Sequence, residues 1–201
     1  MGEQMWAGLR RRIGLGAMVV GALLAVGCSS TVDGTATAAG GTTTTTATTA
    51  ANQVGTDGGG DVDIDVEIGE CVRLGGTMDA ATISEASCGS ADSNYRVIAK
   101  AEKNAQCPSD ADQVYYEESA LGRELGALCL DIDWVIGGCM SVPDGGDDEP
   151  QRVDCADTHV PGVERAVDLI EGATDVEQCT EGGFVYSERE FVVCTEQVRP
   201  L

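Results

Sequence analysis

Nine cysteines are the residues of this chain best suited to chemistry, and their spacing favours disulfide bonds. No two of them form a Cys-x-x-Cys pair and the chain has one histidine, so the ligand spacing of a structural zinc site is missing. Redox centres also place two cysteines close together, which this sequence does not do. Eight cysteines follow residue 60, and an even set of this size in an exported chain predicts a disulfide framework.

An internal similarity suggests how these cysteines pair. Residues 63–71 (DIDVEIGEC) align without a gap with residues 131–139 (DIDWVIGGC), and later cysteines recur in the same order. We therefore predict two tandem disulfide-stapled repeat units, residues 61–129 and 130–201. Eight cysteines can be joined in four disulfides in 105 ways. If disulfides form only within each unit and both units have the same pairing, three ways remain. We favour the pairs that close loops of roughly 15–25 residues: Cys71–Cys88, Cys107–Cys129, Cys139–Cys155 and Cys179–Cys194.

The N-terminal residues predict export and lipid anchoring. Residues 1–27 carry three arginines and then an apolar stretch too short to span a bilayer as a finished helix. The following Gly27-Cys28 resembles the end of a bacterial lipobox, although Ala25 stands where leucine is usual. Cys28 would then accept a diacylglyceryl group and anchor the protein to the outer face of the plasma membrane. The alternative is an ordinary secretory signal that contains a cysteine.

Residues 28–60 form the expected lipidated cysteine and flexible tether. The segment is rich in Thr, Ala and Gly, includes the run Thr42–Thr46, and has almost no large apolar side chain. Such a composition buries too little surface to offset the entropy lost on ordering. We expect a disordered linker that carries an extracytoplasmic domain.

Apolar periodicity predicts a β-rich α+β fold after the tether. Residues 61–68 alternate acidic and apolar side chains, which is typical of a half-buried strand. Further strands are expected at 95–99, 113–116, 183–186 and 190–194. Residues 111–128 fit either a helix or a strand, and residues 161–170 fit a short helix. Trp134 is expected in the core or between the units.

The charge balance excludes nucleic acid as a partner. The chain has 12 Lys and Arg against 34 Asp and Glu, a formal net charge of −22. Phosphate backbones need clustered basic residues, and we expect no cofactor either.

Two weaker chemical sites are considered. A glycine-containing acidic turn could wrap oxygens around calcium, with Asp144, Asp147, Asp148 and Glu149 as candidate ligands. His159 is the one histidine available for a catalytic triad, but no nucleophile motif accompanies it, and a turn histidine is the simpler interpretation.

The run Cys129-Leu-Asp-Ile-Asp-Trp-Val-Ile-Gly-Gly-Cys-Met-Ser-Val142, together with the lipobox and the Thr-rich tether, resembles the LppU-type lipoproteins of actinobacteria. The similarity covers roughly residues 66–197. The stretch around His159 also resembles the extracellular septum-formation domains of the same bacteria. The resemblance implies an envelope protein and supplies no catalytic residues to carry over.

These observations favour a non-enzymatic envelope module that binds a protein or a cell-wall component and is held at the membrane by its lipid anchor. Two alternatives stay open. One is a calcium-dependent adhesion or sensing module, and the other is an unrecognised cell-wall hydrolase.

Overall fold

Ten β-strands and one short 3-10 helix supply the regular structure of the described residues. The computed structural model describes residues 53–77, 80–145, 148–157 and 159–198. The predicted signal peptide, Cys28, tether residues 29–52 and Asp147 lie outside this part of the chain.

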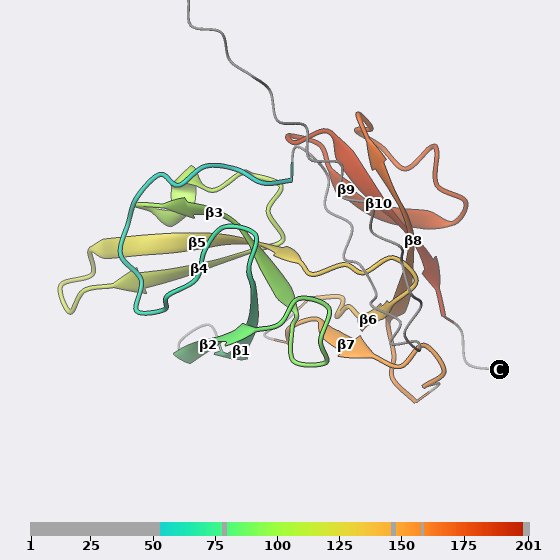
Figure 1. The fold of residues 1–201 in the computed structure, drawn as a ribbon, viewed down its shortest axis with the longest axis horizontal. Helices are drawn as coiled ribbons and strands as arrows, with labels where there is room; N and C mark the ends of the chain where they lie inside the picture. Colours follow the sequence, from blue (N-terminus) through green and yellow to red (C-terminus); the bar gives the residue numbers. More distant parts are fainter. Residues whose placement is uncertain (1–52, 78–79, 146–147, 158, 199–201) are drawn as a thin grey trace, which may run out of the picture. The chain divides into compact units, whose positions relative to one another are not determined.

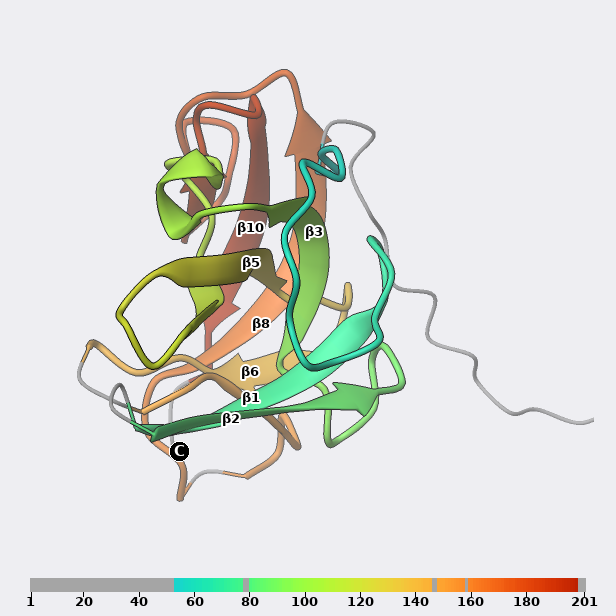
Figure 2. The ribbon, with the colours of Figure 1, turned by 90° about the vertical axis from the view of Figure 1, so that its left-hand side faces the viewer.

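The first sheet is antiparallel and has the strand order β2-β1-β3-β5-β4. Figure 2 shows β1 and β2 side by side and at a steep angle to β3. A single 3-10 turn, η1, lies between β3 and β4. The elements are β1 (Cys71–Thr77), β2 (Ala80–Ala86), β3 (Tyr95–Ala101), η1 (Asn104–Gln106), β4 (Gln113–Glu118) and β5 (Glu124–Ile132).

The second sheet is also antiparallel, with the order β7-β6-β8-β10-β9. This order equals that of the first sheet with every strand number raised by five. Figure 1 shows the first sheet in green and yellow and the second in orange and red. The strands are β6 (Cys139–Ser141), β7 (Gln151–Val153), β8 (Val163–Glu171), β9 (Gly182–Tyr186) and β10 (Phe191–Gln197).

The fold is mostly β rather than α+β, so the helical part of the prediction is wrong. Residues 163–171 form β8, not a helix, and residues 111–128 contain β4 and the start of β5. The pairing of β8 with β10 shifts at Cys194/Thr195 and leaves Val167 without an opposite residue. This bulge breaks the two-residue alternation, so that Val163 and Ala166 are both buried at a helix-like spacing.

Residues 61–70 keep the predicted alternation of burial but form no strand. Asp61, Asp63 and Asp65 are exposed, whereas Val66 is buried in the core. The apolar side chains pack inward although the segment does not join the sheet ladder.

Residues 53–60, which the sequence analysis assigned to the flexible tether, lie against the first sheet. Gly55 N and Gly58 N donate to the carbonyls of Ile98 and Lys100, at 2.7 and 2.8 Å. Asp61 N then donates to Leu125 O at 2.9 Å. Glycine permits this approach, because a Cβ on Gly126 would lie 2.4 Å from Asp61 N. The ordered body therefore includes residues 53–60.

One hydrophobic core spans both sheets. Val72, Val97 and Leu130 from the first sheet belong to the same buried cluster as Met140 and Phe191 from the second. Trp134, in the connection between the sheets, is buried as predicted and packs on Phe184, with ring centroids 4.8 Å apart. The largest buried cluster is therefore shared by both sheets, while two smaller clusters each belong to a single sheet, one around Ile98 and Cys129 and one around Val192 and Cys194.

Four disulfides link the eight cysteines of the described residues. They join Cys71–Cys88, Cys107–Cys129, Cys139–Cys155 and Cys179–Cys194, the same pairs that the sequence analysis favours. Each bridge joins two cysteines of the same predicted unit.

Gly126→Ala tests the packing of residues 53–61 on the sheet. The added methyl group would meet the backbone of Asp61, so we expect a loss of about 1–3 kcal/mol in unfolding free energy, measured by denaturant titration. Gly182→Ala is the matched control, since no heavy atom lies within 4 Å of its added Cβ. Equal stability of both variants would contradict the packing described.

Candidate functional site

Two fully buried carboxylates lie where the chain leaves the first sheet for the second, one near the end of β5 and one just after it. Asp131 and Asp133 are each 0% exposed. They align in sequence with Asp63 and Asp65, which are exposed. Because a buried charge is unfavourable unless it is paired and hydrogen-bonded, the partners of these two residues must come from elsewhere in the fold.

Arg189 neutralises Asp131. It lies in the turn between β9 and β10, and its two terminal nitrogens reach the two carboxylate oxygens of Asp131 at 2.7 and 3.0 Å. Its Nε donates to Asp110 Oδ1 at 2.8 Å, and it also donates to the backbone carbonyls of Asp110 and Gln53. The guanidinium lies over the rings of Tyr186 and Phe191. A residue of the second sheet is thus held by the first.

Asp133, the first residue after β5, forms a second junction. Its Oδ1 accepts from Arg96 of β3 and its Oδ2 from Arg152 of β7, both at 3.1 Å. Ser93 Oγ and Gly89 N complete the shell at 2.7 and 2.6 Å. Arg152 also donates to the Asp133 carbonyl. Burial lowers the pKa of Arg152, and the charge of Asp133 opposes that effect.

A relay of three polar side chains adds to the first junction. Trp134 Nε1 donates to the Tyr186 hydroxyl at 3.2 Å, and that hydroxyl donates to Asp112 Oδ2 at 2.7 Å. Ile132 N donates to the same oxygen at 2.8 Å. Burial of the carboxyl group, and then the charge of Asp131, raise the pKa of Asp112 from 3.8 to about 7. Burial also raises the pKa of Asp131.

The carboxylate oxygens of the two junctions are hydrogen-bonded to other groups of the protein. Each carboxylate oxygen of Asp131 and Asp133 accepts at least one hydrogen bond from a protein donor. The arrangement therefore joins the sheets, and a ligand site has to be sought at the surface.

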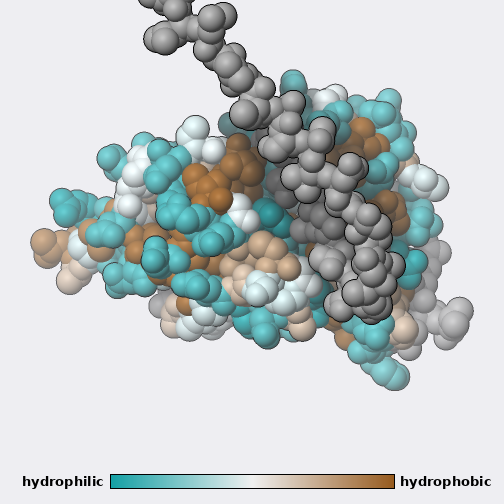
Figure 3. All heavy atoms as spheres, in the orientation of Figure 1, coloured by the Kyte–Doolittle hydropathy of each residue, from teal (hydrophilic) through white to brown (hydrophobic). Residues whose placement is uncertain are grey.

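Four hollows on the surface of the described residues, among others, have volumes of about 380 to 500 Å³. The face shown in Figure 3 is largely hydrophilic, with several separate apolar patches. The hollow of about 460 Å³ is a candidate binding site, because its lining combines apolar, aromatic and acidic side chains and comes partly from the edge strands β2 and β4. We call it the β2–β4 hollow; its lining is Asp63, Ile64, Thr82, Ile83, Ser84, Glu85, Tyr115 and Glu117.

The β2–β4 hollow is organised around Glu117. Its Oε1 accepts hydrogen bonds from the Tyr115 hydroxyl and from Asp63 N, each at 3.0 Å. Burial, followed by the bond to Glu117, raises the pKa of Tyr115 to about 12. The hydroxyl therefore stays protonated at neutral pH, and the hollow offers an aromatic ring beside carboxylates.

The acidic turn is arranged differently from a calcium loop. Asp144, Asp148 and Glu149 line a hollow of about 380 Å³. Glu149 Oε2 accepts the Tyr95 hydroxyl at 2.5 Å, so this carboxylate already bridges the two sheets. In the part of the chain that the structure describes, the one group with metal-like spacing is Cys71, Cys88 and Asp133, and its sulfurs form a disulfide.

His159 lies at an exposed turn, where its backbone N–H donates to Asp157 at 2.9 Å. It lines none of the four hollows. Sequence reasoning missed Arg189 and Tyr115 as key residues. One signal was present: Asp131 and Asp133 interrupt an otherwise apolar run, Leu128–Ile136, which indicates buried and therefore paired carboxylates.

Comparison with known proteins assigns the chain to no family. No protein-family model matches the chain, and neither a curated protein nor a solved structure matches it. Among the described residues, no helix has the length and apolarity that crossing a membrane requires.

Arg189→Ala tests the ion pair between the sheets. Removing the cation leaves Asp131 buried without its partner, so we expect unfolding free energy to fall by about 3–5 kcal/mol. Arg123→Ala removes the same charge from an exposed loop and should change stability by less than about 0.5 kcal/mol. The double variant Asp131→Asn/Arg189→Ala should recover part of the loss in denaturant titrations. A single variant as stable as the control would contradict the role of the pair.

The raised pKa of Asp112 predicts a pH-dependent stability. Between its ordinary pKa of 3.8 and about 7, the folded chain holds a proton that the unfolded chain has released. This contribution is complete below the lower value and is lost as pH rises through the upper one. The melting temperature should therefore fall as pH rises from about 4 to about 7, and Asp112 should add little further change at higher pH.

Asp112→Asn keeps an oxygen acceptor for Ile132 N and the Tyr186 hydroxyl but cannot titrate. Its melting temperature should fall less steeply over the same pH range. The difference is expected to be small, because Asp112 is an exposed residue and only its hydrogen-bonded carboxyl group is enclosed, by Ile132 N and the Tyr186 hydroxyl. Parallel curves for the two proteins would rule out Asp112 as the titrating group.

Proposed function

We propose that this protein is a lipid-anchored extracytoplasmic lipoprotein whose β body acts as a non-enzymatic binding module of the cell envelope. The observation that carries the proposal is the joining of all eight cysteines of the described residues in disulfides. Disulfides of this kind persist in oxidising compartments outside the cytoplasm. Export is also what the N-terminal sequence and Cys28 predict.

Binding is favoured over hydrolysis by the distribution of chemical groups. The most deeply buried carboxylates, Asp131 and Asp133, are paired with arginines between the sheets. His159 is exposed and lines none of the four hollows. The β2–β4 hollow instead presents the mixture of apolar and polar groups that is typical of recognition sites.

The calcium-dependent alternative has weaker support. Glu149, one of its four candidate ligands, is held by the Tyr95 hydroxyl. Of the other three candidate ligands, Asp144 and Asp148 line the same hollow as Glu149, and Asp147 lies outside the described residues.

We also infer that the body arose by duplication and that it is related to the LppU-type lipoproteins. Three features support the duplication: matching strand orders, disulfides at equivalent strands, and equivalent bulges at Ile98 in β3 and Val167 in β8. Gly69 N bonds Val97 O, and Gly137 N bonds Ala166 O, each at 2.7 Å. Equivalent backbone contacts at equivalent residues are expected of two copies of one ancestral unit.

Lipidation of Cys28 is the first test of this function. In a bacterial host, the mature chain should begin at Cys28, carry the mass of a diacylglyceryl group, and sediment with membranes. Cys28→Ser should be unacylated and leave the membrane fraction, while free-thiol counting under denaturation finds all eight remaining cysteines oxidised in both proteins. An unmodified wild-type Cys28, or a body retained in the cytoplasm with free thiols, would refute the proposal.

A further inference from the structure

The strand β2 forms an open edge of the first sheet. With seven residues it is the longest of the four edge strands β2, β4, β7 and β9 of the described sheets. Natural edges are usually protected by lysine, proline, bulges or short length. Its sequence, AATISEA, contains a single charge and no proline, and its pairing with β1 is continuous. This edge therefore lacks the common protections against strand addition.

The hydrogen bonds around Asn94 show which groups of β2 face the open edge. Leu74 N donates to Asn94 Oδ1, and Asn94 Nδ2 donates to Leu74 O, each at 2.8 Å. Asn94 N donates to Val72 O at 3.1 Å. These groups of β1 thus point away from β2. In an antiparallel pair, opposite residues exchange both hydrogen bonds or neither.

The residues opposite Leu74 and Val72 are Ile83 and Glu85. Their N–H and C=O groups consequently point to the outside of the sheet. Because this direction alternates along a strand, the N–H and C=O groups of Ala81, two residues before Ile83, also point outward. Thr82 and Ser84 carry the bonds to β1. Three outward-facing residues in one strand form a template for an incoming strand.

The β2–β4 hollow lies along this template and is acidic. Ile83 and Glu85 line it from β2, and Tyr115 and Glu117 line it from β4. Glu85 also lines a neighbouring hollow of about 490 Å³ that contains Glu70. None of the residues lining the two hollows is basic.

Among the described residues, the carboxylates of the β2–β4 hollow form no ion pair. The ion pairs between described residues all involve Asp110, Asp131 or Asp133, so Asp63, Glu85 and Glu117 have no such partner in that part of the chain. An approaching ammonium or guanidinium group would supply the missing charge and could lie against the Tyr115 ring. A second copy of this chain, with a net charge of −22, would instead add like charge.

We propose that β2 binds an extended, lysine- or arginine-containing peptide segment of a partner protein as an added strand, with its basic side chains in the β2–β4 hollow. This inference rests on the proposed binding function and specifies its partner. Backbone bonds to Ala81, Ile83 and Glu85 would supply affinity, and the carboxylates would select basic sequences.

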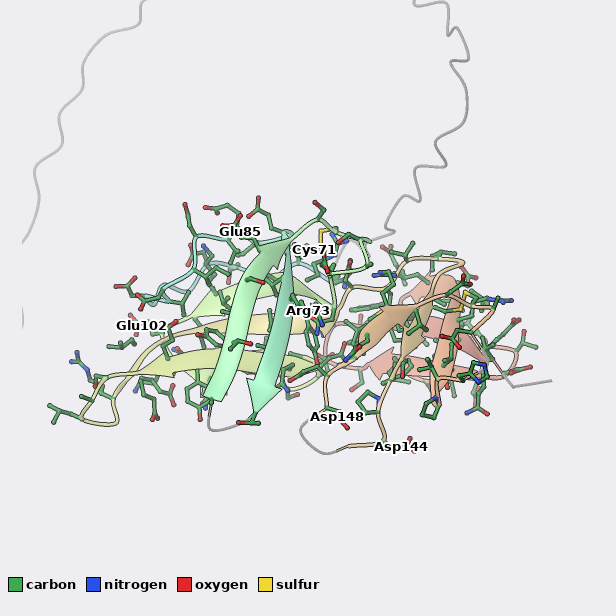
Figure 4. All side chains as sticks on the ribbon, turned by 90° about the horizontal axis from the view of Figure 1, so that it is seen from below. Cys71, Arg73, Glu85, Glu102, Asp144 and Asp148 are labelled. Atoms are coloured by element: carbon green, nitrogen blue, oxygen red, sulfur yellow. A yellow bond between two sulfur atoms is a disulfide. The ribbon has the colours of Figure 1, made fainter. Side chains whose placement is uncertain are left out.

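The test is peptide binding to the full mature chain in nonionic detergent, measured by fluorescence anisotropy. A capped peptide of alternating lysine and valine should bind saturably, and its affinity should fall with added salt. A glutamate–valine peptide should not bind. Glu85→Gln/Glu117→Gln should weaken binding about tenfold. Glu102→Gln is a control on a separate loop, visible apart from Glu85 in Figure 4, and should bind as tightly as the unaltered chain.

Backbone pairing is tested on the peptide, so that the protein fold is untouched. Methylating alternate peptide nitrogens blocks the strand edge that faces β2 in one variant and the opposite edge in the other. We expect one variant to lose binding and the other to keep it. Equal binding of both methylated variants, absence of lysine-peptide binding, or a dimer of this chain paired through β2 would each overturn the inference.

These outcomes separate the inference from the broader function. An envelope protein cross-linked equally by the unaltered chain and by Glu85→Gln/Glu117→Gln would leave the binding function standing and overturn the β2 site. A chain that is not acylated at Cys28 would refute the function whatever the peptide result.

Discussion

The arrangement of the two sheets depends on neutralising two carboxylates that the chain buries between them. Asp131 and Asp133 are fully buried, and each would be strongly unfavourable without a cation. Arg189 comes from the β9–β10 turn, Arg96 from β3 and Arg152 from β7, so the pairs fix elements of both sheets. Gln53 Nε2 also reaches Asp131, which draws the segment before the first sheet into the same junction.

Disulfides stabilise each sheet region separately, and ion pairs join the two sheets. Each disulfide closes a short loop within one sheet region, at separations of 15 to 22 residues. The shared core and the two arginine–aspartate junctions join one sheet to the other. Three of the few basic residues are used in these junctions. The surface is therefore left acidic, which gives the β2–β4 hollow its preference for a basic ligand.

Local patterns predicted much of the fold, and long-range contacts decided the rest. The internal sequence similarity and short loop lengths favoured the disulfide pairs, and the strands expected at 95–99, 113–116, 183–186 and 190–194 correspond to β3, β4, β9 and β10. The helix expected at 161–170 failed because the bulge at Val167 imitates helical spacing. Asp131 and Asp63 occupy equivalent positions in sequence yet differ completely in burial, because only Asp131 meets an arginine 58 residues away. Ile83, Tyr115 and Glu117 meet through tertiary packing, which no local pattern encodes.

Residue-resolved amide hydrogen exchange of β2, with and without the lysine–valine peptide, tests the central claim most directly. The account predicts fast exchange at Ile83 and Glu85 in the free chain and marked slowing when the peptide is bound. Thr82 and Ser84, whose amides face β1, should exchange slowly in both states and serve as internal references. Unchanged exchange at Ile83 and Glu85 on addition of the peptide, or protection of these amides already in the free chain, would contradict it.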